Sequence, residues 1–156
     1  MGIQLGIVGY GGMGGFHHRN ASKIEGVQVV GAYDIDPVRV QVAEESGLRG
    51  FSSLEDLLAC EDINTVLVAV PNDCHMEICI AASNAGKHVI CEKPAALNVD
   101  ELDQMIAPRL VATGNSSPYI RTVVGTRTSG SSRISLIPGN WERCIPSSPD
   151  CMDPVE

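Results

Sequence analysis

The sequence predicts an α/β fold over residues 1–107, a doubly wound parallel sheet with helices on both faces. Segments of strand composition alternate with segments of helical pattern through short connections, which is typical of βαβ units. The run over residues 65–70 is apolar almost throughout rather than alternating, as expected for a strand buried on both faces. A glycine-rich turn directly follows the first expected strand.

Short sequence patterns predict where the individual helices and strands lie. Pro37 suits the first turn of a helix. Ser52 and Glu55 have the spacing of a capping box, which predicts a helix start, and Asn98 and Glu101 have nearly the same pattern. We expect strands at residues 3–8, 27–33, 65–70 and 88–91, helices at residues 12–24, 37–47 and 75–85, and two further helices starting near Ser52 and Asn98.

The composition narrows the functional class. The formal net charge is −8, which argues against nucleic-acid or anionic-membrane partners, since these need a basic face. The sequence contains no run of about 20 apolar residues and no signal-peptide pattern, so we expect a cytoplasmic protein. The six cysteines form no Cys-x-x-Cys pair, so we expect no metal site and interpret them as small residues in a reducing compartment.

A glycine fingerprint follows the first strand. Asp34 ends the second expected strand, twenty positions after the last glycine of the motif. This context is that of the dinucleotide-binding turn of a Rossmann domain, whereas the alternative is an ordinary glycine-rich turn with an acidic strand end. The motif consists of Gly9, Tyr10, Gly11, Gly12, Met13 and Gly14.

Each position of the fingerprint has a physical role. Gly9 permits the tight turn, Gly11 lets the backbone approach a pyrophosphate, and Gly14 lets the helix pack closely. Asp34 can accept hydrogen bonds from the adenosine ribose, and its charge would repel a 2′-phosphate. Because no arginine sits beside it, we expect NAD rather than NADP. His17 and His18, in the following helix, are expected to be packing or surface residues, not ligands.

Two further stretches, Val70-Pro71-Asn72-Asp73-Cys74-His75 and Cys91-Glu92-Lys93-Pro94, follow later strands of the expected sheet. Together with the opening Gly-Ile-Val-Gly-Tyr-Gly-Gly-Met-Gly, they resemble the glucose–fructose oxidoreductase, inositol dehydrogenase and rhizopine catabolism (Gfo/Idh/MocA) family. The resemblance covers residues 3 to about 107. Glu-Lys-Pro in this position is fairly specific to the family, whereas the glycine motif is not.

The resemblance implies an NAD(P)-dependent oxidoreductase acting on a sugar, polyol or related hydroxyl compound, with a homo-oligomeric full-length parent. Lys93 would contact the substrate hydroxyl and the nicotinamide ribose. The residues lining the cofactor cleft would be Val70, Pro71, Asn72 and Glu92. Lys93 could instead be a surface lysine, and we expect His75 to begin a helix rather than to act as a catalyst.

Two other functional classes remain open. A non-enzymatic NAD-binding sensor or interaction module would share the cofactor motif, and so would a methyltransferase-like adenosine binder, although the latter leaves Glu92-Lys93-Pro94 unexplained. By the resemblance, family members are longer and carry an α+β second domain with an Asp-x-x-x-His pair. This chain has no histidine after His88, so we expect it to retain nucleotide binding but little catalysis.

The pattern changes after about residue 107. Residues 108–156 hold most of the nine prolines and no sustained periodicity, so we expect an irregular tail there without a helix or strand of appreciable length. Permitted codons for residues 116–150, read from one nucleotide earlier, allow the segments VHQNRRWD and GKLGEVYPIESR, which resemble the start of the family's second domain. We therefore interpret this tail as a frameshifted translation.

Overall fold

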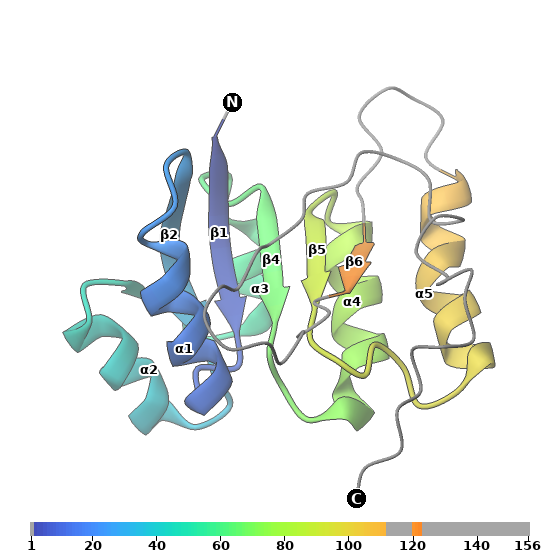
Figure 1. The fold of residues 1–156 in the computed structure, drawn as a ribbon, viewed down its shortest axis with the longest axis horizontal. Coiled ribbons are helices and arrows are strands. Elements are labelled where there is room, and N and C mark those ends of the chain that lie inside the picture. The colour runs from blue at the N-terminus through green and yellow to red at the C-terminus, as the bar shows by residue number, and fades with distance from the viewer. Residues whose placement is uncertain (1, 112–119, 123–156) are drawn as a thin grey trace, which may run out of the picture. The chain divides into compact units, whose positions relative to one another are not determined.

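A computed structural model describes the backbone of residues 2–111 and 120–122 and the side chains of residues 2–106. The described strands form one parallel six-stranded sheet in the order β3-β2-β1-β4-β5-β6 (Figure 1). The strands are β1 (Ile3–Val8), β2 (Val27–Tyr33), β3 (Arg49–Gly50), β4 (Thr65–Val68), β5 (His88–Cys91) and β6 (Ile120–Thr122). The helices are α1 (Gly12–Ala21), α2 (Pro37–Glu45), α3 (Leu54–Ala59), the 3₁₀ turn η1 (Asn72–Cys74), α4 (His75–Asn84) and α5 (Val99–Val111).

Side chains that alternate along the central strands pack into two separate hydrophobic cores, one on each face of the sheet. Leu5, Ile7 and Leu67 pack with residues of α1 and α2 on one face. Val8, Val66 and Val68 pack on the other face with α3, α4 and Met105 of α5. Figure 1 shows α1 in front of the sheet and α3 behind it. Because both faces are covered, these strands are mostly apolar, with Gln4 and Thr65 as polar exceptions. The predicted doubly wound Rossmann fold is confirmed.

The strand order places a topological switch at β1. The chain passes from β1 outwards to β2 and β3, then returns to β4 on the other side of β1. In such sheets the loops at the carboxyl ends of β1 and β4 separate there and leave a crevice for a ligand. The fold therefore positions the glycine turn after β1 beside the loop after β4.

Several boundaries differ from the sequence prediction. Helix α1 ends at Ala21 rather than near residue 24, and the Ser22 hydroxyl donates to the His18 carbonyl oxygen there. Strand β4 ends at Val68, not at residue 70. The cap of α3 is Ser53, whose oxygen accepts from the Asp56 N–H, instead of Ser52. Two adjacent serines and two adjacent acids made both registers compatible with the spacing.

The structure also continues beyond the boundary expected at residue 107. Helix α5 runs to Val111, and β6 pairs in parallel with β5. The sequence prediction missed β6 although Ile120, Thr122, Val123 and Val124 form a β-branched run that favours strand structure. The expectations for residues 112–119 and 123–156, including the irregular tail, lie outside the described residues.

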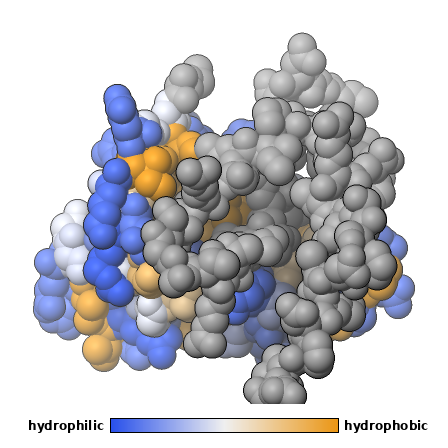
Figure 2. Space-filling model, in the orientation of Figure 1, coloured by the Kyte–Doolittle hydropathy of each residue, from blue (hydrophilic) through white to orange (hydrophobic). Residues whose placement is uncertain are grey.

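The surface of the described part is mixed in polarity. Exposed apolar side chains lie at Ile35, Val38 and Val42. Figure 2 shows the corresponding apolar surface over α2, among hydrophilic residues. In the part of the chain that the structure describes, no helix has the length and apolarity needed to cross a membrane.

Candidate functional site

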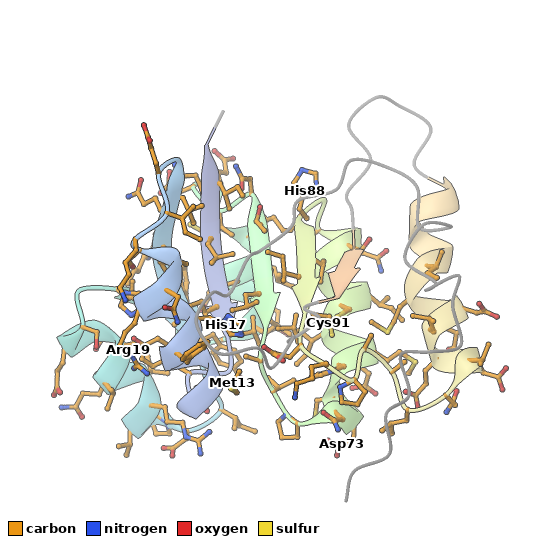
Figure 3. The ribbon with its side chains drawn as sticks, in the orientation of Figure 1. Met13, His17, Arg19, Asp73, His88 and Cys91 are labelled. Carbon is orange, nitrogen blue, oxygen red and sulfur yellow. The ribbon has the colours of Figure 1, made fainter. Side chains whose placement is uncertain are left out.

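The predicted site residues gather at one edge of the sheet, where the carboxyl ends of the strands lie. Figure 3 shows Met13 at the start of α1 and Asp73 in η1 at this edge, with Cys91 at the end of β5. His88, at the other end of β5, lies at the opposite edge of the sheet, and its ring points away from the sheet. The topology thus brings the glycine turn, the loop after β4 and the loop after β5 to the same edge.

The fold itself requires glycine at two positions of the turn. Gly9 has a φ of +90°, and a Cβ placed there would lie 2.5 Å from the Ala69 carbonyl oxygen. A Cβ on Gly14 would lie 2.0 Å from the Gly9 carbonyl oxygen. Both clashes involve backbone atoms, so no side-chain movement relieves them. The predicted roles of Gly9 and Gly14, tight turn and close helix packing, match this geometry.

Gly11 is different, because protein packing does not require it. Among the described residues, a Cβ there would meet only the Arg39 guanidinium, at 3.2 Å from Nη1, and Arg39 is a flexible surface side chain. A Cβ on Gly12 would have no neighbour within 4 Å in the part of the chain that the structure describes. Gly11 is also the N-cap of α1 and supplies no side-chain hydrogen bond. The turn therefore leaves open space in front of N–H groups at a helix start, which fits a phosphate group approaching the backbone.

Asp34 holds the glycine turn in place and keeps free hydrogen-bond acceptor positions on its carboxylate. It is buried, with Oδ2 accepting from the Tyr10 N–H at 2.7 Å and Oδ1 accepting from the Asp36 N–H at 2.9 Å. A carboxylate has about four acceptor positions, so these two bonds leave room for ribose hydroxyls. Asp34 thus has a structural role in the turn, and its ribose-binding role stays a prediction.

Arg39 corrects one premise of the cofactor prediction. We expected no arginine beside Asp34, but the Arg39 Nη1 lies 3.6 Å from Asp34 Oδ2 and its Nε lies 3.7 Å from Asp36 Oδ2. Asp36 caps α2, and the first turn of that helix carries Arg39 back towards the glycine turn. The absence of a nearby arginine therefore no longer supports NAD over NADP.

The two histidines of α1 connect the site to its surroundings. The His18 Nδ1 lies 2.6 Å from the Tyr10 hydroxyl, which joins α1 to the glycine turn. Burial, and then the charge of Arg19, lower the pKa of His18 below its ordinary value. His17 hydrogen-bonds through Nε2 to the Glu92 carboxylate, which lies 75 residues away in sequence. Both histidines are half-buried, and each has a polar partner that the sequence did not indicate.

Glu92 and Lys93 have contrasting environments. The Glu92 side chain is buried, contacts His17 through Oε1 and accepts the backbone N–H of Lys93 through Oε2 at 3.1 Å. Lys93 is exposed, and among the described residues its ammonium group has no ion-pair partner. The carboxylate therefore holds the backbone of the loop while the lysine side chain remains available.

The loop after β4 is fixed mainly at its ends. Val70 is half-buried, whereas Pro71, Asn72 and Asp73 are exposed at the site edge. His75 begins α4, as predicted, and is fully buried. Its Nδ1 lies 2.9 Å from the Pro94 carbonyl oxygen and its Nε2 lies 3.0 Å from the Val70 carbonyl oxygen. His75 thus contacts both loops that follow β4 and β5.

Within the described ranges, no group of three or more histidine, cysteine or acidic side chains is arranged to hold a metal ion. Cys79 and Cys91 are buried and Cys60 is half-buried, in agreement with their interpretation as packing residues, but Cys74 is exposed. Partial desolvation, then the charge of Asp73, raise the pKa of the Cys74 thiol.

Comparison with known proteins identifies the family of this fold and site. The model of the Gfo/Idh/MocA oxidoreductase family, NAD-binding Rossmann fold, matches residues 3–109. The chain belongs to this family. Inositol 2-dehydrogenase of Salmonella typhimurium is 34% identical over 129 residues, which cover 76% of this chain and 38% of that protein.

Solved structures extend the comparison. An NAD-binding protein from Listeria innocua matches with a TM-score of 0.72 and 37% identity over 78% of this chain and 35% of that one. The WlbA dehydrogenase from Bordetella pertussis, solved with NADH and UDP-GlcNAcA, matches with a TM-score of 0.65 and 31% identity over 69% of this chain and 32% of that one. This Gfo/Idh/MocA chain therefore spans well under half the length of these relatives.

Proposed function

We propose that this chain binds NAD at the carboxyl edge of its sheet and forms the cofactor half of a dehydrogenase acting on a sugar, polyol or related hydroxyl compound. The observation that carries the proposal is the space beside Gly11, a glycine that the packing of the described residues does not require. The NADH and nucleotide-sugar complex of the WlbA dehydrogenase supports the same assignment by analogy.

Two groups of residues would divide the cofactor between them. The adenosine side comprises the glycine turn, Asp34 and Arg39, where the first N–H groups of α1 would receive the pyrophosphate and Asp34 the ribose. The nicotinamide side comprises the loops at residues 69–75 and 92–97, with Val70, Pro71, Asn72 and Glu92 along the cleft. When bound, the nicotinamide ring accepts a hydride from the carbinol carbon.

NAD is the proposed cofactor, with NADP the less favoured one. The buried Asp34 carboxylate would repel a 2′-phosphate. Arg39 is half exposed, with 54% of its side chain accessible, and its charge lies beside the same carboxylate. An arginine near this position can bind a 2′-phosphate, so Arg39 reduces the expected difference in affinity between NAD and NADP.

Lys93 is the proposed catalytic residue. Its exposed ammonium group extends from a loop whose backbone is held by Glu92, so it can contact a substrate hydroxyl and pass a proton at that oxygen. Since the chain has no histidine after His88, a second acid–base group of that type is absent from the tail. We therefore propose that the chain binds cofactor and turns over little substrate.

A cofactor titration combined with an activity assay tests this proposal. NADH is titrated into the full chain, and NAD reduction is followed with a panel of polyols and sugars. We expect saturable NADH binding with little or no turnover, and any residual turnover should disappear in Lys93→Met while binding remains. Absence of NADH binding would refute the proposal, whereas rapid turnover would refute the limited role proposed for this chain.

The non-enzymatic alternative rests on the missing histidine. A sensor or interaction module would bind NADH without turnover and would also tolerate Lys93→Met without a change in its response to the cofactor. The frameshift interpretation of residues from about 108 onward, which is also a proposal, is tested separately by sequencing the coding DNA across codons 100–150. A one-base change that restores VHQNRRWD supports it, and a coding sequence that cannot yield this segment in a neighbouring frame rejects it.

A further inference from the structure

We infer that His75 is a positioning residue that holds the two nicotinamide-side loops in register with each other. The inference rests on the proposed function, because these loops matter only if a nicotinamide cofactor lies between them. It goes beyond the glycine fingerprint and the Glu92-Lys93-Pro94 motif, which do not include this residue. His75 contacts neither a reacting atom nor a proposed cofactor group in this account.

The contacts of the imidazole carry the inference. One ring nitrogen reaches the carbonyl oxygen of Val70, two residues before η1, and the other reaches the carbonyl oxygen of Pro94, next to Lys93. These carbonyls belong to loops that follow neighbouring strands, β4 and β5. The ring is completely buried, so water does not compete for either bond. One side chain thus fixes the distance between the two loops.

The chemistry of the partners makes histidine the suitable residue. Both partners are carbonyl oxygens, which only accept hydrogen bonds. The imidazole ring places one nitrogen against each carbonyl oxygen, at 2.9 Å and 3.0 Å, and its N–H group donates to the carbonyl that it faces. An aliphatic side chain of similar volume would fill the space but would leave both buried carbonyls without this donor.

Two conservative substitutions can separate the two contacts. An asparagine amide nitrogen can occupy the place of the imidazole Nδ1, and a glutamine amide nitrogen can occupy that of Nε2. His75→Asn therefore retains the bond to Pro94 alone, and His75→Gln retains the bond to Val70 alone. His75→Leu removes both while keeping an apolar core residue.

Amide hydrogen exchange of the full chain without cofactor tests whether His75 holds the two loops together. We expect His75→Leu to accelerate exchange at least tenfold in residues 69–74 and 92–98, His75→Gln only in 92–98, and His75→Asn only in 69–74. A purely structural role would instead accelerate exchange along α4 in all three variants alike. Equal patterns in the Asn and Gln variants, or no change in the Leu variant, would overturn the inference.

Cofactor binding tests the consequence for the site. NADH contains the nicotinamide half, whereas ADP-ribose lacks the nicotinamide ring, so we expect His75→Leu to raise the Kd for NADH about tenfold and to leave that for ADP-ribose unchanged. An equal rise in both Kd values, or no rise in either, would contradict a role of His75 in positioning the nicotinamide side. If the wild-type chain binds neither ligand, the proposed function fails, and the exchange pattern still decides whether His75 clamps the loops.

Discussion

On the adenosine side of the candidate site, residues 9–14 and 34–39 belong to one βαβ unit, and the Asp34 carboxylate joins them. The Tyr10 N–H bonds to Asp34, and Gly14 packs against the Gly9 carbonyl. On the nicotinamide side, side chains from distant segments hold the loops, as when His17 reaches Glu92. Steric limits on the glycine turn thus define much of the first side, whereas side-chain hydrogen bonds between distant segments define the second.

The largest expected effect comes from breaking the adenosine side sterically. Gly14→Ala places a Cβ 2.0 Å from the Gly9 carbonyl oxygen, so the helix must move away from the turn. We expect the free energy of unfolding to fall by about 3 kcal/mol or more, measured by urea denaturation. Gly12→Ala is the matched control, because its Cβ meets nothing within 4 Å and alanine favours a helix over glycine by about 1 kcal/mol. Similar stabilities for the two variants would contradict this account of the turn.

A weaker effect is expected at the corner where Arg39 meets Asp34. Arg39→Gln removes the positive charge 3.6 Å from the Asp34 carboxylate. We expect the Kd for NADPH to rise about tenfold, equivalent to about 1.4 kcal/mol, and that for NADH to rise less than about threefold. Lys23→Gln, on the turn after α1, is the charge-matched control and should change neither Kd. A larger rise in the Kd for NADH than in that for NADPH would show that Arg39 does not interact with the 2′-phosphate.

On the nicotinamide side, Glu92→Gln weakens a polar contact without changing the size of the side chain. The amide retains an acceptor for Lys93 but loses the charge that faces His17. We expect the Kd for NADH to rise about threefold to tenfold, whereas the Kd for ADP-ribose stays unchanged. Glu45→Gln, at an exposed position in α2, serves as the control. An equal rise in the Kd for NADH and for ADP-ribose would mean that Glu92 does not act on the nicotinamide side alone.

The smallest effect concerns pH and His18. Its lowered pKa means that the unfolded chain, with an ordinary histidine pKa of 6.5, binds more protons than the folded chain at mildly acidic pH. The contribution to stability is therefore complete above the unfolded pKa and is lost as the pH falls below 6.5 towards the folded pKa. In His18→Asn the amide oxygen can still accept from the Tyr10 hydroxyl but does not titrate. Thermal unfolding from about pH 5 to pH 7.5 should show a shallower pH dependence in the variant, and identical slopes would contradict the assignment.

The same comparison explains what the sequence could predict. The glycine turn and Asp34 lie close together in sequence, and their spacing reflects steric requirements, so the pattern predicted their positions. Arg39 was missed because its approach to Asp34 depends on the first turn of α2, although its place three residues after the Asp36 cap was a usable signal. The pairing of His17 with Glu92 left no local signal, because only the assembled sheet brings α1 and the loop after β5 together.

The most direct test of the central claim is calorimetric titration of NADH into the full chain and into Gly11→Val. Because a Cβ on Gly11 would meet only the Arg39 guanidinium among the described residues, while valine is a poorer helix N-cap than glycine, the substitution should lower the Tm by no more than about 5 °C. It should nevertheless raise the Kd at least tenfold by blocking the pyrophosphate. That combination would establish that the glycine turn serves a dinucleotide. Equal NADH affinity in the two proteins, or no binding to the wild-type chain, would contradict the account.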